Sequence, residues 1–496
     1  MNQILLSPTD VLFFRDGRPM GGSLAGHTAA WPLPTVTNAA LHAALWRSGL
    51  ADSAHAHTRK AGVEHASARN ERFGSLTTAG PFPVCTHGAV PTWFFPAPAD
   101  ARCETTRDPD DNQTGQGTTK DTLRPSAPIP DSASSNPLPL AVASLVPPSK
   151  EKSDAWWSEG AWNAYLGTAN NNRDTLAARL FTKSDTDFAD IEAQIGIGID
   201  PERGTQDGTR IYSAHYLRLR EGWCLGLFAA TAEKFEEEDR RGQRHDLLEQ
   251  LLSTDNTIIL GGQQRICTAE RQSIANGQRL PLPLGMAGGF ATATLTALGD
   301  PQPKHLVKWV LLSPAVFPEI RPAEGASDAE GRPLQHHSGG WLPTWISDDN
   351  EHRVLLRAPL PARDVKNESR DAYRARVRIQ EPIAARLVAA VVPKPIPVTG
   401  WSLGSAPESS ISDPASPIRP AGAKPTHLAV PAGAVYYFAC DSAKDAAALA
   451  SALNWHGETP GTTIRNRRST LLGEKGFGLG VCGTWTPHGR EGTSST

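Results

Sequence analysis

The residues with the most distinctive chemistry lie near the end of the chain, where glycines recur over positions 473–483 and arginines precede them. Glycine has no Cβ, so a glycine-rich backbone can approach a phosphate chain closely, while cations neutralise it and an aromatic ring stacks on a base. The candidate contacts are Arg465, Arg467, Arg468, Lys475, Gly476, Phe477 and Gly478. The pattern predicts a loop that clamps nucleic acid, and the alternative is a glycine-rich hairpin that closes a sheet.

The same glycines match the dinucleotide-binding pattern G-x-G-x-x-G at Gly478, Gly480 and Gly483. That pattern binds a cofactor only where it follows a strand, opens a helix and meets an acidic residue about 20 positions later. The residues after Gly483 contain no helical pattern. We therefore predict no cofactor.

Further cationic or polar positions are spread along the chain. Two arginines follow the first predicted strand, a turn at 34–37 presents the amides of a helix N-terminus, and a Gly-Gly-Gln-Gln-Arg turn spans 261–265. Alternation along a later predicted strand puts positions 210 and 212 on one face. These candidate RNA-binding residues are Arg15, Arg18, Asn38, Arg210, Tyr212 and Arg265. With the terminal loop, they predict a protein that follows a single RNA strand.

Several patterns that could indicate an enzyme or a metal site lack the context that the chemistry needs. Ser402 lies in a G-x-S-x-G pattern, but prolines precede it and a Pro- and Ser-rich stretch follows, where a nucleophile elbow needs a strand and a helix. Histidines at 55, 57, 336 and 337 have no third ligand at a recognisable spacing, and His245 and Asp246 fall in a predicted charged helix. We predict no metal site, and a serine hydrolase is the third hypothesis.

His27 supports an alternative from another class. An imidazole that titrates near neutral pH can act as the general base in metal-independent RNA cleavage. His27 stands beside Gly26 and before Trp31-Pro-Leu-Pro. A polar loop residue is the simpler interpretation, and an endoribonuclease is the alternative.

Composition limits these hypotheses. The 496 residues suffice for two to four domains, and a hydrophobic content of 39% can fill ordinary cores. A formal net charge of −3 means that RNA binding must depend on local basic clusters. The 6 cysteines are far apart, so neither a zinc site nor a disulfide framework is predicted. Because the chain shows neither a signal-peptide pattern nor an apolar run of about 18 residues, we expect a cytoplasmic protein with no membrane partner.

Hydrophobic periodicity predicts two α+β units, each a sheet backed by helices. The first unit has a predicted helix at 37–46 with Ala40, Leu41, Ala44 and Leu45 on one face. Its other predicted elements are strands at 4–14, 222–230 and 257–260, a strand pair at 81–95, helices at 156–166, 173–181 and 232–252, and a long hairpin of strands 194–200 and 209–220.

The second unit has predicted strands at 305–312, 353–356, 387–392 and 435–438 and a helix at 442–455 before the glycine-rich loop. Two segments interrupt the pattern. Residues 101–153 are rich in Asp, Thr, Ser, Pro and Gly with few large apolar residues, so we predict a disordered insertion. Residues 393–426 form a second Pro- and Ser-rich segment.

Ordered sequence blocks resemble one family. They are Asp10-Val-Leu-Phe-Phe-Arg-Asp-Gly-Arg-Pro19, Trp31-Pro-Leu-Pro, Gly80-Pro-Phe-Pro, Phe95-Pro-Ala-Pro-Ala-Asp100, Gly196-Ile-Gly-Ile-Asp200, Ile211-Tyr-Ser, Gly261-Gly-Gln-Gln-Arg265, Pro431-Ala-Gly-Ala-Val-Tyr-Tyr-Phe and the terminal Gly-Phe-Gly-Leu-Gly. In this order, over nearly the whole chain, they resemble the third subunit of the Cmr complex, a RAMP protein of type III-B CRISPR effectors.

The resemblance implies an α+β chain of two ferredoxin-like, RRM-type domains facing each other, with a β-hairpin thumb near 188–220 and a glycine-rich loop at 473–483. Residues 1–100 and 154–260 would form the N-terminal domain, interrupted by the insertion 101–153, and residues 261–496 the C-terminal domain. The subunit would hold the crRNA 5′ tag without catalysis of its own, and would contact the large polymerase-like subunit and the backbone RAMP subunits in antiviral defence. The RAMP alternative is a crRNA-processing endoribonuclease with His27 as general base.

Overall fold

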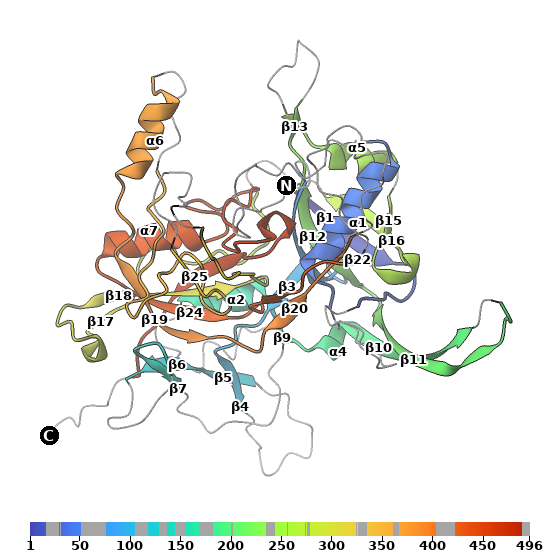
Figure 1. Cartoon of the computed structure of the whole chain (residues 1–496), viewed down its shortest axis with the longest axis horizontal. Coiled ribbons are helices and arrows are strands. Elements are labelled where there is room, and N and C mark those ends of the chain that lie inside the picture. Colours follow the sequence, from blue (N-terminus) through green and yellow to red (C-terminus); the bar gives the residue numbers. More distant parts are fainter. Residues whose placement is uncertain are drawn as a thin grey trace.

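The computed structural model describes most of the chain (Figure 1). The described residues are 1–15, 29, 31–50, 76–104, 118–127, 136–143, 155–167, 182–199, 202–234, 244–254, 256–272, 274, 278–323, 325, 335–360, 367–402 and 422–488. Arg18, His27 and the predicted helix at 173–181 lie outside these residues.

The first sheet has eight strands in the order β15-β16-β1-β12-β2-β3-β8-β9. Every neighbouring pair is antiparallel. The strands are β15 (Thr257–Ile259), β16 (Ile266–Gln272), β1 (Asn2–Pro8), β12 (Trp223–Ala230), β2 (Thr77–Cys85), β3 (Thr92–Pro96), β8 (Trp156–Ser158) and β9 (Thr182–Lys183).

The second sheet has five strands, also antiparallel throughout. Its order is β17-β18-β24-β19, and β25 pairs with β18 beside β17. The strands are β17 (Thr292–Ala293), β18 (Lys304–Leu311), β24 (Val435–Cys440), β19 (Ala385–Val391) and β25 (Gly480–Thr484). The strand β25 therefore extends the sheet beyond the glycine-rich loop.

Helices cover the outer face of each sheet. The helices α1 (Pro34–Arg47) and α5 (Leu247–Thr254) pack on one face of the first sheet. The predicted apolar stripe of α1 is confirmed, because Ala40, Leu41, Ala44 and Leu45 all belong to this buried cluster. The helix α7 (Ala443–Leu453) covers the outer face of the second sheet through Leu449 and Leu453 among others.

The inner faces of the two sheets share one hydrophobic core. It joins Phe82, Phe95 and Phe228 of the first sheet to Val310 and Val435 of the second. The helix α2 (Glu159–Gly167) supplies Trp162, Tyr165 and Leu166 to the same cluster. Because apolar residues of both sheets are buried together, the two sheets are held against each other.

A group of polar side chains is buried inside this shared core. Asp100, just after β3, accepts hydrogen bonds from the hydroxyls of Tyr165 at 2.7 Å and Tyr437 at 2.8 Å. Lys308 of β18 lies with its Nζ 3.5 Å from the centroid of the Tyr165 ring. Burial raises the pKa of Asp100 and lowers the pKa of Lys308 to about 8. The group ties Asp100, in the segment after β3, and α2 to two strands of the second sheet.

The prediction of a disordered insertion is wrong for its described parts. The strand β4 (Ala101–Glu104) pairs with β5 (Thr118–Thr122), and β6 (Arg124–Ser126) pairs with β7 (Ala141–Ala143). The side chains of Leu123, Leu138 and Leu140 are buried, and the amide of Leu140 donates to the Val388 carbonyl of β19 at 3.0 Å. These few leucines bury enough surface to fold a segment whose composition is otherwise polar.

The predicted helix at 232–252 is also wrong in its first half. The strands β13 (Glu233–Lys234) and β14 (Arg244–His245) pair there, and α5 begins only at Leu247. The Asp246 carboxylate caps that helix, because it accepts from the amides of Thr231 at 3.0 Å and Leu248 at 3.1 Å. Asp246 is thus a helix cap, which is a structural role.

The remaining elements are short or lie between the main ones. They are the helices α4 (Asp185–Phe188) and α6 (Arg370–Arg378), the hairpin β10 (Ala189–Ile199) and β11 (Gln206–Leu219), the pair β20 (Ile396–Val398) and β23 (His427–Ala429), the pair β21 (Trp401–Ser402) and β22 (Gly422–Ala423), and the 3₁₀ turns η4 (Gly262–Gln264), η5 (Thr296–Leu298) and η7 (Gly473–Lys475). The predicted strand at 353–356 is replaced by isolated bridges at Arg353 and Val354.

The predicted α+β class is confirmed as a mixture of helices with mostly antiparallel sheets. None of the helices in the described part of the chain combines the length and apolar character that crossing a bilayer requires.

Lys308 should make stability depend on pH. Its folded pKa is about 8 and its ordinary value is 10.5, so between these values the unfolded chain binds one more proton than the folded chain. The contribution of Lys308 to the free energy of unfolding should therefore rise with pH across this window. Chemical denaturation of the full chain and of Lys308→Met across the window should show a more positive slope of the free energy of unfolding against pH in the wild type. Equal slopes in the two proteins would contradict a buried ammonium.

Candidate nucleic-acid interface

The predicted hairpin is confirmed as β10 paired with β11, and it extends away from the two sheets (Figure 1). The pairing runs from Ala189 opposite Leu219 to Ile199 opposite Gln206. Ile191 and Ile195 lie on one face of β10 and are 54% and 79% exposed. Arg210 and Tyr212 are in β11 at positions that share a face of the strand, and their side chains are outside the described part.

The base of the hairpin is joined to the segment that follows β1. Leu12 and Leu217 form a bridge in which each amide donates to the other residue's carbonyl at 2.8 Å. The Phe13 and Tyr216 rings also meet, with centroids 5.4 Å apart. Because β11 is held by this segment, the first sheet determines where the hairpin starts.

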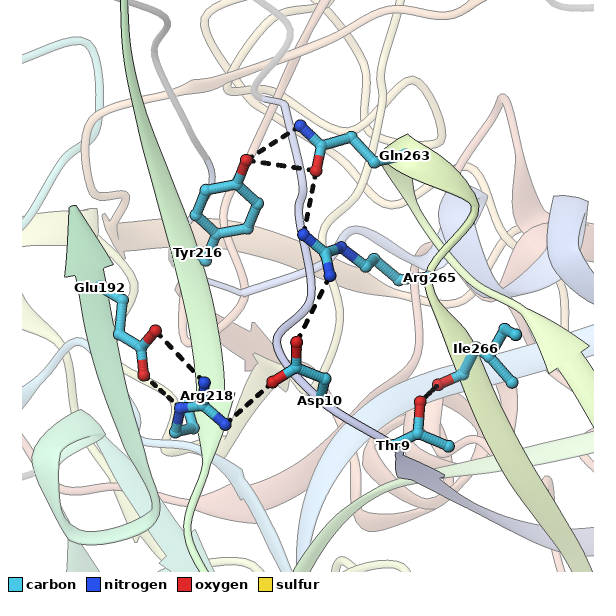
Figure 2. A network of polar contacts seen from close by, with 8 residues as sticks. All are labelled: Thr9, Asp10, Glu192, Tyr216, Arg218, Gln263, Arg265 and Ile266. Carbon is cyan, nitrogen blue, oxygen red and sulfur yellow. Dashed lines mark hydrogen bonds and ion pairs between the residues drawn. The ribbon is translucent and has the colours of Figure 1, made fainter. Parts of the chain in front are cut away.

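A chain of polar contacts surrounds this junction (Figure 2). Asp10 forms ion pairs with Arg218 of β11 at 3.1 Å and with Arg265 at 3.5 Å. Arg218 also pairs with Glu192 of β10, and this hydrogen bond raises the pKa of Arg218. Arg265 donates to the Gln263 side chain at 3.1 Å, and that amide contacts the Tyr216 hydroxyl at 2.9 Å. Two guanidinium groups thus share two carboxylates at the root of the hairpin.

The turn that carries Arg265 has an unusual backbone. Gln263 and Gln264 have φ values of 57° and 52°, in the left-handed region that non-glycine residues rarely adopt. Gly261 precedes them at φ 77°, and a Cβ there would lie 2.6 Å from the carbonyl oxygen of Phe13. The amide of Gly262 donates to the same carbonyl at 2.8 Å. Such strain persists where surrounding contacts fix the backbone, and it is concentrated at functional sites.

The glycine-rich loop lies at the contact between the two sheets. Gly476 has φ 97°, and a Cβ there would lie 2.9 Å from the Ala79 Cα and the Thr78 carbonyl oxygen of β2. A Cβ on Gly483 of β25 would lie 2.9 Å from the Leu166 side chain of α2. These glycines therefore permit close packing within the protein, as the alternative of a loop that closes a sheet predicts.

Phe477 does not offer an exposed ring. It is 0% exposed and packs with Val316, Val398, Ala429 and Leu471. Its predicted role as a stacking face is wrong in this structure, because the loop turns the ring into an apolar cluster. Gly478 is held just as closely, since a Cβ there would lie 2.0 Å from the Ser469 amide nitrogen.

The arginines before the loop have different surroundings. Arg465 is exposed, whereas Arg467 is partly buried and donates to the Ile464 carbonyl at 3.2 Å. Arg468 donates to the Ala452 carbonyl in the last turn of α7 at 2.6 Å, and burial lowers its pKa to about 10. A cation at that position satisfies a helix C-terminus. Arg465 is therefore the exposed cation of the predicted cluster, and Lys475 is half-buried, as Arg467 and Arg468 are.

Asn38, a predicted RNA contact near the start of α1, is buried in this structure. Asn38 is 4% exposed and donates to the Thr78 hydroxyl at 3.1 Å, and Thr37 donates to the Pro34 carbonyl at 3.1 Å. Asn38 and Gly476 thus meet at the same residue of β2, inside the protein. Arg15 is exposed just beyond Phe14.

The other sequence patterns gain no support in the described part of the chain. His337 is buried and its Nε2 lies 2.9 Å from the Ile346 carbonyl, while His336 faces Glu319. Ser402 lies in the two-residue strand β21, and the residues after it are outside the described part. Within the described residues, no three His, Cys, Asp or Glu side chains gather where they could hold a metal.

Sequence reasoning missed four members of the junction: Asp10, Glu192, Arg218 and Gln263. One signal was available, because Arg218 continues the alternation that placed positions 210 and 212 on one face of β11. Its acidic partners could not be found in this way, since Asp10 is more than 200 positions away along the chain.

These features define a two-sheet α+β protein that gathers arginines at the root of a projecting hairpin. The family model described as CRISPR-associated protein (Cas_Cmr3) matches residues 4–485, and the chain therefore belongs to this family. The resemblance to a Cmr subunit predicted from the sequence blocks is confirmed at this level.

Solved structures with some similarity include chains of the type III-B Cmr-beta complex bound to cognate target RNA, one with AMPPnP and one without it. In both cases the identity is 12%, the match covers 88% of this chain and 86% of the other, and the TM-score is 0.34. Comparison with curated protein sequences gave no match. The TM-score is too low to add to the family assignment.

Gly476→Ala should destabilise the protein by about 2 to 4 kcal/mol, because the new methyl group meets backbone atoms of β2 and the residue keeps an unfavourable φ. Gly473→Ala in the same loop is the matched control, since its nearest neighbour would be the Arg467 Cβ at 3.5 Å. Its cost should stay below about 1 kcal/mol. Urea denaturation of both variants measures the difference, and equal costs would contradict the packing role of Gly476.

Gln264→Gly should raise stability by about 0.5 to 1 kcal/mol, because glycine adopts the left-handed conformation without strain. The Gln264 side chain makes no hydrogen bond within the described part of the chain, so little is lost. Gln263→Gly relieves similar strain but removes the contacts with Tyr216 and Arg265, and should give no net gain. Thermal unfolding of the two variants tests this order, and a destabilised Gln264→Gly would contradict it.

Proposed function

We propose that this chain is the RNA-binding subunit of a type III-B CRISPR effector complex, where it holds the crRNA 5′ tag. The observation that carries the proposal is the Cas_Cmr3 family match, which spans residues 4–485. In this proposal the chain also docks the large polymerase-like subunit and the first backbone RAMP subunit, and cleavage of target belongs to those partners.

The strand orders support a pair of ferredoxin-like domains. In the first unit the chain runs β1-α1-β2-β12-α5-β16, and the sheet order is β16-β1-β12-β2. In the second unit it runs β18-α6-β19-β24-α7-β25, and the sheet order is β25-β18-β24-β19. With the elements between them left out, both orders match the βαββαβ sequence of the ferredoxin-like motif with the fourth strand beside the first, except that no described side chain of α6 joins a buried cluster of its unit. The core between the sheets supports an arrangement in which the two domains face each other.

The hairpin junction is the part of the described surface best suited to an RNA backbone. Arg218 and Arg265 are 45% and 27% exposed, and each is held by a carboxylate or an amide. A guanidinium can exchange a carboxylate for a phosphate, because both present paired oxygens to the same fork of donors. The strained turn and the hairpin base fix where these groups lie. They would therefore set the register of the strand rather than read its bases.

The near-neutral chain implies that affinity is shared with neighbouring subunits. A formal net charge of −3 provides no general attraction for RNA, and the exposed arginines can neutralise few phosphates. We therefore place tight binding in the assembled complex, with this chain contributing local contacts at the 5′ end.

Purification of this protein from its native host, through an added affinity tag, tests the proposal. We expect short RNAs with one common repeat-derived 5′ end, together with a large subunit and RAMP partners. Recovery of the chain without RNA or partners would contradict it.

A variant carrying Arg265→Gln and Arg465→Gln should then reduce the affinity for tagged RNA and lower the salt slope of binding by roughly 1 to 2. Arg353→Gln is the matched control, because Arg353 is 69% exposed but pairs with Glu351 at another surface. Equal binding by the double variant and the control would argue against these contacts.

A further inference from the structure

The helix α6, which connects β18 to β19, projects from the body of the protein beyond α7 (Figure 1). Its nine residues, Arg370–Arg378, include Arg370, Arg374, Arg376 and Arg378. Arg370, Ala372 and Ala375 are exposed, and Ile379 just after the helix is 80% exposed. No described side chain of α6 belongs to a buried hydrophobic cluster. Packing of the core therefore does not explain why this helix exists.

Local contacts hold the helix in shape. The Ser369 hydroxyl accepts from the Ala372 amide at 3.0 Å, which caps the first turn. Arg376 makes two hydrogen bonds of 3.0 Å with the Glu368 carboxylate, and its guanidinium lies 5.1 Å from the centroid of the Tyr373 ring. Arg376 is thus paired within α6 and the residues just before it, and its hydrogen bonds with Glu368 raise its pKa.

The other three arginines form a row along the helix. Positions 370, 374 and 378 are four residues apart, so they lie on one side of α6. With a rise of about 1.5 Å per residue, successive positions are about 6 Å apart along the axis. Asp371 is the single acidic residue among the nine, so the helix carries an excess of positive charge. Arg370 is exposed, and a row of arginine positions of this kind in a chain of negative net charge is a local cationic feature.

We propose that this row binds the sugar-phosphate backbone of an RNA strand, as a second contact separate from the hairpin junction. The inference rests on the proposed RNA-binding function and assigns a role to a helix that the function does not otherwise use. Arginine suits phosphate because its planar fork donates two hydrogen bonds to one group. A protein partner is the competing occupant, because arginine is also enriched at protein interfaces. Three like charges at equal spacing favour RNA, whose phosphates repeat along the backbone. On α6 the one aromatic residue, Tyr373, is already covered by Arg376.

The test compares full-length wild type with a variant carrying Arg370→Gln, Arg374→Gln and Arg378→Gln. The probe is a fluorescent single-stranded RNA with a repeat-derived 5′ end, titrated at several salt concentrations with the chain in its complex. Loss of three phosphate contacts should weaken binding at least about tenfold and reduce the slope of log K against log salt by about 2. Glutamine has a helix propensity close to that of arginine, so α6 should stay folded.

The matched variant carries lysine at the same three positions and should keep most of the salt slope, because its charges are retained. Arg376→Gln should leave the slope unchanged, since Arg376 pairs with Glu368. If wild type binds the RNA and the glutamine variant binds it with the same slope, the inference about α6 fails while the proposed function stands. If wild type binds no RNA, both fail. If the glutamine variant loses a protein subunit and keeps its RNA slope, α6 contacts protein and the inference is overturned.

Discussion

The buried carboxylate of Asp100 is the interaction on which the arrangement of the two sheets depends. It lies between the hydroxyls of Tyr165 and Tyr437, which come from α2 and from the second sheet, and Lys308 approaches from β18. Removing a carboxylate from water is costly, and a buried group of this kind is favourable only when its partners satisfy it. The shared apolar core supplies the free energy that presses the sheets together, and the polar group fixes one orientation within it. Leu123, whose amide donates to the Asp100 carbonyl at 2.6 Å, attaches the insertion to the same point.

The glycine-rich loop and the hairpin are both placed relative to the two packed sheets. The glycine-rich loop of the second unit fits against β2 of the first only if the sheets hold their spacing, since Gly476 has no room for a methyl group. The hairpin is anchored through Leu12 and Leu217, and so its direction is set by the first sheet. The C-terminal loop and the base of the hairpin are therefore both fixed by contacts with backbone of the first unit.

Local periodicity predicted the elements that depend on neighbouring residues. It did not predict features that depend on contacts between residues distant in the sequence. The stripe Ala40, Leu41, Ala44 and Leu45 was visible because a helix repeats every 3.6 residues. The hairpin was visible because both strands and its turn adjoin in sequence. The burial of Phe477 was not visible in the sequence, because a ring among glycines can face either solvent or the core. Phe477 is buried because it packs against Val316 and Val398, which are distant in the sequence. Composition misjudged the described parts of residues 101–153 for a related reason: Leu138 and Leu140 are buried in hydrophobic clusters that include residues of the second sheet.

The arginines at the hairpin junction and those in the row on α6 have different surroundings, with different consequences for the proposed RNA binding. At the hairpin junction, Arg218 and Arg265 are held by Asp10, Glu192 and Gln263, so a phosphate must compete with groups already in place. Replacing a carboxylate by a phosphate contributes little net affinity. Because the arginines are held in a fixed geometry, only an RNA strand in the right register can make both contacts. On α6 no described side chain joins a buried hydrophobic cluster. In the proposed contact, the charges of its arginine row would act over about a Debye length, which speeds association without fixing the register of the RNA. A chain with a net charge of −3 can in this way combine attraction at α6 with positioning at the junction, without general affinity for nucleic acid.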